Sequence, residues 1–189
     1  MVPRVVETNA QADSDVWYRI DRQDRITAFG GAWRSVPIEE TAGAVPAAGV
    51  IGTRIYDHVS GHFTRRFLRE FFQQARRQTA TSKRRTYRCD GPGQKVLVEM
   101  TAHADECGNI LTTHRDVEVV TLPFNVNVVD VRSRRMASVL RCSMCNRLQS
   151  LQGGGWREPE EVARPNVVTS VVHTVCSDCR QGIAARISC

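Results

Sequence analysis

Four cysteines in the last third of the chain stand in two Cys-x-x-Cys pairs. Cys142 and Cys145 form the first pair, and Cys176 and Cys179 form the second. A two-residue gap lets both sulfurs of a pair turn toward one point, and four thiolates are the ligand set that tetrahedral Zn²⁺ favours. The four residues would fill every position around the ion, so the pattern predicts a structural zinc site rather than a catalytic one.

Other chemistry of these cysteines stays open at this level. An iron–sulfur cluster takes the same four thiolates, and spacing does not separate it from zinc. A zinc–thiolate redox switch would release its metal on oxidation. His173 is a weaker candidate ligand because four thiols already complete the set. The remaining cysteines lack a nearby partner and are predicted to be ordinary thiols: Cys89, Cys107 and Cys189.

Short elements are predicted around the two Cys-x-x-Cys pairs, which we call the first and the second knuckle. A glycine turn at residues 153–155 leads to Trp156 and then to a short helix with an acidic, proline-containing start at residues 158–162. An apolar stretch at residues 171–175 precedes the second pair. So small a module has little apolar surface to bury, which is why a metal is expected to hold it together.

The longer upstream part alternates between strand and helix signals. Residues 16–20 and 25–29 predict a hairpin, and residues 84–89, 95–104 and 109–120 predict a three-stranded antiparallel meander. Between them, Phe63, Phe67, Phe71 and Ala75 recur every four residues, which predicts an amphipathic helix after Gly61. Shorter helices are predicted at residues 37–41 and 53–59.

This order of elements resembles a PAS domain. The matching residues are Trp17-Tyr18-Arg19-Ile20-Asp21, residues 51–59, and residues 105–109 leading to Arg115-Asp116-Val117-Glu118-Val119. The resemblance implies an α+β fold in which a five-stranded antiparallel sheet and a helical crossing enclose a small cavity. Residues 141–180 resemble the small cysteine-rich tails that follow sensor domains in bacterial signalling proteins.

The resemblance divides the chain into four parts. Residues 1–15 are a tail, residues 16–122 the PAS-like domain, residues 123–140 a helical connector, and residues 141–189 the zinc module. The implied function is signal sensing, in which the cavity binds an unidentified small ligand or the protein forms a homodimer. The dimer would form through the PAS-like domain or through the connector. A signalling protein is expected as a further partner. A haem in the cavity would need a proximal histidine, for which His58 and His62 are better placed than His103 or His114.

Charge supplies a second class of function. The net charge is +6 and the pI about 9.2, which favours attraction to phosphates. A nucleic-acid-binding zinc module would use the arginines around the first knuckle. These are Arg132, Arg134, Arg135, Arg141 and Arg147. No aromatic residues interleave with them, so a solvated basic surface is the favoured interpretation.

Several classes of protein are not expected. The sequence has no long apolar run and no basic, apolar signal segment, so we expect a cytosolic protein without membrane contact. No Gly-rich phosphate loop, paired carboxylates or Ser/His/Asp arrangement stands out, and the chain is not expected to be an enzyme.

Overall fold

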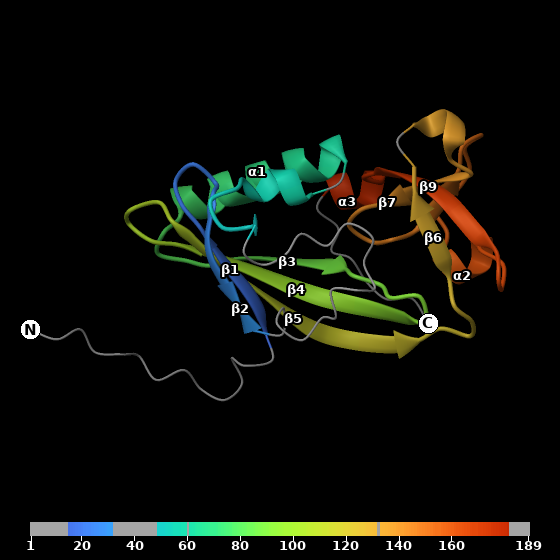
Figure 1. The fold of residues 1–189 in the computed structure, drawn as a ribbon, viewed down its shortest axis with the longest axis horizontal. Helices are drawn as coiled ribbons and strands as arrows, with labels where there is room; N and C mark the ends of the chain where they lie inside the picture. Colours follow the sequence, from blue (N-terminus) through green and yellow to red (C-terminus); the bar gives the residue numbers. More distant parts are fainter. Residues whose placement is uncertain (1–14, 32–48, 60, 132, 182–189) are drawn as a thin grey trace, which may run out of the picture.

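The computed structural model describes residues 15–31, 49–59, 61–131 and 133–181. Within them the chain builds two β-sheets, and one long helix lies along a face of the first sheet (Figure 1). Strands and few helices are mixed as the predicted α+β class requires. The predicted helix at residues 37–41 lies outside the described residues. None of the described helices combines the length and apolar character needed to cross a bilayer.

The first sheet is antiparallel and has the spatial order β2-β1-β5-β4-β3. Its strands are β1 (Val16–Ile20), β2 (Ile26–Gly30), β3 (Lys83–Arg88), β4 (Gln94–Ala104) and β5 (Ile110–Thr121). Pairing of β1 with β5 joins the opening hairpin to the meander in one sheet. The prediction of a five-stranded antiparallel sheet is therefore confirmed.

The buried face of β4 changes along the strand. Lys95 and Leu97 are buried at its beginning, whereas Val98, Met100 and Ala102 are buried further on. The change falls where the pairing of β4 with β5 shifts its register, between Leu97 and Val98. A bulge of this kind bends and twists a strand. Different faces of β4 therefore contribute to two separate cores.

Helix α1 (His62–Arg77) confirms the predicted amphipathic helix. It follows Gly61, whose φ of 83° lies in the left-handed region that glycine adopts without a Cβ clash. Phe71, Phe72 and Ala75 are buried against the sheet core. The predicted piece at residues 53–59 is a 3-10 helix, η4 (Ile55–His58).

The second sheet has the order β6-β9-β7-β8. Its strands are β6 (Asn127–Asp130), β7 (Val139–Cys142), β8 (Leu148–Ser150) and β9 (Val168–Thr174), and its short helices are η5 (Arg134–Met136), α2 (Pro159–Val162) and α3 (Ser177–Arg180). Strand β9 pairs in parallel with both β6 and β7. The predicted short helix at residues 158–162 is present as α2.

The predicted helical connector at residues 123–140 is wrong. Its described residues contain strand β6, the single turn η5 and the start of β7. Val128 and Val129 favour a pleated conformation because they are β-branched, and β6 finds its partner in β9, far along the chain. The second sheet therefore begins at Asn127, upstream of the predicted boundary at residue 141.

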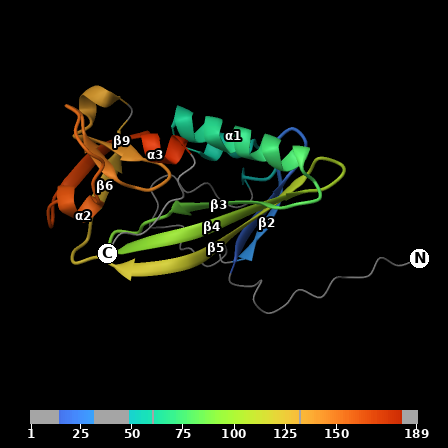
Figure 2. The ribbon, with the colours of Figure 1, turned by 180° about the vertical axis from the view of Figure 1, so that it is seen from behind.

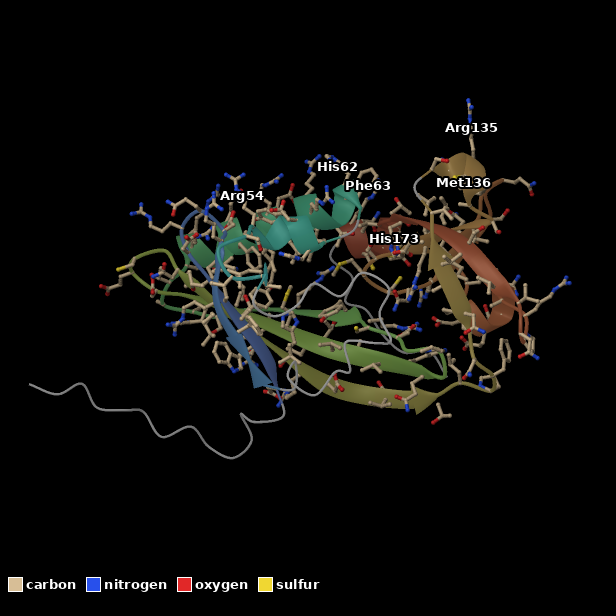
Figure 3. All side chains as sticks on the ribbon, in the orientation of Figure 1. Arg54, His62, Phe63, Arg135, Met136 and His173 are labelled. Carbon is tan, nitrogen blue, oxygen red and sulfur yellow. The ribbon has the colours of Figure 1, made fainter. Side chains whose placement is uncertain are left out.

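The two sheets are packed against each other at one end of α1. Figures 1 and 2 show α3 beside the end of α1 that carries His62 and Phe63, which Figure 3 labels. Arg180 of α3 lies over the ring of Phe63, with its guanidinium carbon 4.8 Å from the ring centroid. Phe63, the first member of the predicted apolar stripe, is 43% exposed and contacts α3 instead of being buried in the sheet core.

Candidate metal centre

The fold brings together all four cysteines of the two Cys-x-x-Cys pairs. The sulfur atoms of Cys142, Cys145, Cys176 and Cys179 all lie within 4.8 Å of one another, and the Cys145 and Cys176 sulfurs are 3.8 Å apart. Four sulfurs at about 2.3 Å from a tetrahedral Zn²⁺ would be about 3.8 Å apart. The cluster therefore has the size and donor set to hold one metal ion.

The first knuckle connects β7 to β8. The Cys142 N–H donates to the Arg147 carbonyl at 2.9 Å, and the Asn146 N–H donates to the Cys142 carbonyl at the same distance. Asn146 closes this turn with a φ of 57°. Asparagine enters this left-handed region more readily than most residues. The turn points Cys142 and Cys145 toward a common position.

The second knuckle lies at the start of α3. Cys176 is the N-cap of this helix, and its sulfur accepts the Cys179 N–H at 3.4 Å. The Cys176 N–H in turn donates to the Cys142 sulfur at 3.4 Å, which links the two knuckles directly. Backbone N–H groups directed at sulfur favour the thiolate form. One sulfur of each knuckle, that of Cys142 and that of Cys176, therefore accepts a backbone N–H that stabilises its negative charge.

Proton sharing among the sulfurs shows how closely they are placed. Hydrogen bonds from Cys145 and Cys179 hold the pKa of Cys142 far below its usual range. The hydrogen bond between Cys142 and Cys145 raises the pKa of Cys145 to about 12. Hydrogen bonds to Cys142 and Cys145 raise the pKa of Cys179 well above its usual range. Four thiolates at these distances repel one another, so only a cation among them allows all four to be charged.

The cysteines are buried where the two sheets meet. Each is at most 5% exposed, and they share a hydrophobic cluster with Leu97 of β4, Tyr87 of β3 and Phe67 of α1. The Arg88 N–H donates to the Met144 carbonyl inside the first knuckle at 2.7 Å. Four protein ligands in a buried position leave no place for a substrate or a reactive water, which is typical of a structural site.

A buried ion network fastens the knuckles to the first sheet. Arg88 donates to Glu158 at 2.5 Å and to Asp90 at 3.1 and 2.5 Å, and Lys95 lies 2.5 Å from Glu160. Burial works to raise the pKa of Glu158, but the hydrogen bond and charge of Arg88 outweigh it and hold that pKa below its usual range. The sequence marked Glu158 only as the acidic start of a helix.

His173 lies beside the cluster and contacts other groups instead. Its Nδ1 is 3.2 Å from Ser143 Oγ and its Nε2 is 2.8 Å from Asp130 Oδ1. No spacing in the sequence indicated this Ser-His-Asp arrangement. In hydrolase triads the serine faces Nε2 and the aspartate faces Nδ1, the reverse of what is found here. These two hydrogen bonds connect β6 and β9 to the first knuckle (Figure 3 labels His173).

The two histidines named for a haem lie at the surface. His58 is exposed with Nε2 2.6 Å from Thr53 Oγ1, and His62 is exposed at the start of α1. Their positions give the haem prediction no support. The histidine in the sheet core is His114, whose Nδ1 is 3.0 Å from Tyr87 Oη and whose pKa burial lowers to about 4. Side chains alternate between the two faces of a strand, so His114 lies on the same face of β5 as buried Ile110 and Thr112. This alternation could have identified His114 from the sequence.

Comparisons with known proteins give no family. No protein-family model matches the chain, and no curated protein does. A crystal structure of a C-terminal domain from Streptococcus mutans is similar at 15% sequence identity and a TM-score of 0.40, over 56% of this chain and 77% of that one. A TM-score this low supports no conclusion about fold or function.

Proposed function

We propose that this protein is a PAS-like sensory or interaction module with a structural zinc ion in its four-cysteine centre. An opening hairpin, a helical crossing and a three-stranded meander in one antiparallel sheet support the PAS-like part. Four buried sulfur atoms at spacings suited to tetrahedral Zn²⁺ support the zinc part.

The observation that carries the proposal is a pair of aromatic rings shared by two cores. Phe67 of α1 and Tyr87 of β3 pack against the core of the first sheet and also against the cysteine cluster. Arg85 of β3 adds a hydrogen bond to the Cys179 carbonyl at 3.0 Å. A ligand or partner that shifted α1 against the sheet would therefore move the wall of the metal centre. The metal module would both stabilise the joint and respond to it.

Metal analysis of freshly purified protein tests the zinc part. We expect about one zinc per chain, no iron, and a colourless sample. Iron with a visible charge-transfer absorption would replace zinc by an iron–sulfur cluster. A Soret band would instead revive the haem hypothesis. A sample with neither zinc nor iron would remove the metal from the proposal.

Hydrogen exchange tests the coupling between the two parts. Removing the metal with a strong chelator should speed amide exchange in β3 and in the first turns of α1, where Phe67 lies, because these elements pack on the cluster. The hairpin β1–β2 lies at the other edge of the sheet and is the internal control. Exchange changes confined to the second sheet would overturn the sensory coupling while leaving the zinc site standing.

A homodimer through the PAS-like sheet or through residues 123–140 stays a prediction, as do a cytosolic location, a signalling partner and the absence of enzymatic activity. Light scattering at several concentrations addresses the dimer. Native mass spectrometry of the purified protein addresses a small ligand retained in the PAS-like core. A mass equal to chain plus zinc, with monomers at every concentration, would count against both.

Nucleic-acid binding remains the alternative of another class. Arg147 pairs with Glu158 at 3.1 Å and Arg141 lines a pocket, whereas Arg134 and Arg135 are exposed. Arg132 lies outside the described residues. Two exposed arginines are a small footprint for phosphates. Undetectable binding to mixed DNA and RNA at low salt would exclude this alternative.

The zinc–thiolate redox switch is a separate alternative. Zinc release under mild peroxide would favour it.

A further inference from the structure

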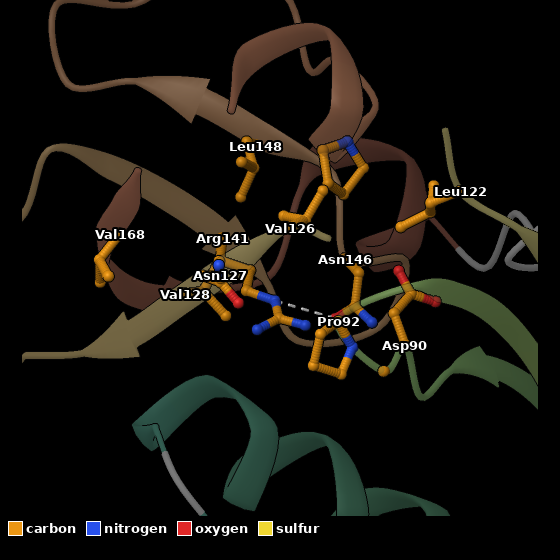
Figure 4. A pocket seen from close by; sticks show the side chains of 12 residues that line it. Asp90, Pro92, Leu122, Val126, Asn127, Val128, Arg141, Asn146, Leu148 and Val168 are labelled. Carbon is orange, nitrogen blue, oxygen red and sulfur yellow. Dashed lines mark hydrogen bonds between the residues drawn. The ribbon is translucent and has the colours of Figure 1, made fainter. Parts of the chain in front are cut away.

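A pocket lies at the seam between the two sheets, beside the first knuckle and outside the core beneath α1. Its volume is about 310 Å³, at the small end of the range for small-molecule sites. The first half of the chain contributes the loop at Asp90 and Pro92, and the second sheet contributes Arg141, Leu148 and Val168. Figure 4 shows Arg141 extending among the lining side chains.

Arg141 is half-buried and is not paired directly with a carboxylate. Asp90 and Asp130 lie near enough to act on its charge, but they are bonded to Arg88 and to His173. Its Nε donates to Asn146 Oδ1 at 3.2 Å, the dashed line of Figure 4. Within residues 15–31, 49–59, 61–131 and 133–181, no carboxylate forms a salt bridge with it.

The neighbouring carboxylate is already engaged. Asp90 accepts two hydrogen bonds from Arg88, at 3.1 and 2.5 Å, and a third from the Val96 N–H at 3.1 Å. Its charge is thus satisfied by Arg88. The N–H donors on the terminal guanidinium nitrogens of Arg141 are therefore available to a ligand. Val126, Val128 and Leu148 give the rest of the wall an apolar character.

We propose that this pocket binds a small carboxylate with a short aliphatic body, held by the guanidinium of Arg141. A planar guanidinium matches a carboxylate with two parallel hydrogen bonds, and the aliphatic body would cover the valines and Leu148. A phosphate dianion fits less well because one cation faces it and Asp90 lies on the same wall. The proposal does not depend on the sensory role, since the pocket stands apart from the core beneath α1.

Binding of simple probes to the zinc-loaded full chain tests the proposal. Isovalerate and hexanoate are compared with isovaleramide, which keeps the shape of isovalerate but not its charge, and with inorganic phosphate. By calorimetry or NMR titration we expect a carboxylate to bind at least about tenfold more tightly than the amide or phosphate. No carboxylate binding at about 10 mM, or equal binding of the amide, would overturn it.

Matched variants assign the binding to this pocket. Arg141→Gln should abolish carboxylate binding, and Arg141→Lys should weaken it about tenfold because lysine lacks the planar fork. Since Arg141 contacts Asn146 of the first knuckle, zinc content reports whether these variants keep the fold. Val168→Glu changes a wall residue that is 63% exposed and adds a repelling charge, so it should weaken binding without unfolding. Arg135→Gln, on exposed η5, is the control. Unchanged affinity in all three pocket variants would place the carboxylate elsewhere and overturn the assignment.

Discussion

Arg88 at the end of β3 and Glu158 at the N-cap of α2 form a buried ion pair between the two halves of the molecule, with Nη1 and Oε2 2.5 Å apart. The side chain of Arg88 is fully buried and that of Glu158 is 10% exposed. Lys95 and Arg147 also reach Glu158, so one carboxylate serves three cations. The pair fixes how the metal module sits on the sheet.

Replacing Glu158 should therefore be costly. Glu158→Gln leaves Arg88 and Lys95 buried with less compensating charge, and we expect a loss of about 3 kcal/mol in the free energy of unfolding. Denaturant unfolding measures it. Glu70→Gln is the control because Glu70 pairs with Arg66 at the surface, where a loss below about 1 kcal/mol is expected. Equal effects of the two substitutions would contradict a structural role for the buried network.

Metal binding should depend on the cluster cysteines and not on the exposed ones. Cys142→Ser removes one buried ligand, and we expect loss of bound metal and a marked drop in melting temperature, since metal binding contributes directly to folding. Cys107→Ser changes an exposed thiol in the β4–β5 turn and should leave both unchanged. Elemental analysis and thermal unfolding of the two variants give the comparison. Full metal content in Cys142→Ser would show that the cluster is not the site.

Acid should weaken the fold through His114. In the unfolded chain a histidine takes up its proton near pH 6.5, whereas burial lowers the pKa of folded His114 to about 4. The contribution of this group is complete above about pH 6.5 and is lost as the pH falls toward 4. From the size of this pKa shift we expect the contribution to amount to roughly 2 kcal/mol.

The readout is the difference in unfolding free energy between the natural protein and His114→Gln, which has no titrating ring. Other acid-sensitive groups, including the cysteine cluster, are common to both proteins. The stability of the natural protein should fall more steeply between about pH 6.5 and 4. Parallel pH profiles would show that His114 does not titrate abnormally.

Asn146 should be hard to replace because of its backbone conformation. At a φ of 57° an alanine carries a steric penalty of roughly 1 to 2 kcal/mol that glycine escapes. Both substitutions lose the hydrogen bonds to the Arg88 carbonyl and to Arg141. Asn146→Ala should therefore be less stable than Asn146→Gly, measured by thermal unfolding of metal-loaded protein. The reverse order would mean that the knuckle turn relaxes to another conformation.

Much of the fold could be predicted because its signals are local. The five strands of the first sheet follow from the alternation of apolar and polar residues, and helix α1 follows from its four-residue apolar period. The metal site follows from the Cys-x-x-Cys spacing, which lets both sulfurs of a pair bind one ion. The connector could not be predicted. Its valines suit a strand or a buried helical face, and only β9, about 40 residues later, decides between them.

Local patterns were enough to predict that four thiols would meet and that a hairpin, a helix and a meander would form. The position of the cysteine cluster depends on contacts between distant parts of the chain. Its burial against Phe67 and Tyr87 and the Arg88–Glu158 pair join residues that lie far apart in the chain. Such contacts depend on how the two sheets pack against each other. No local sequence pattern encodes this packing, because a buried charge is stable only when another part of the chain supplies the opposite charge and excludes water from both.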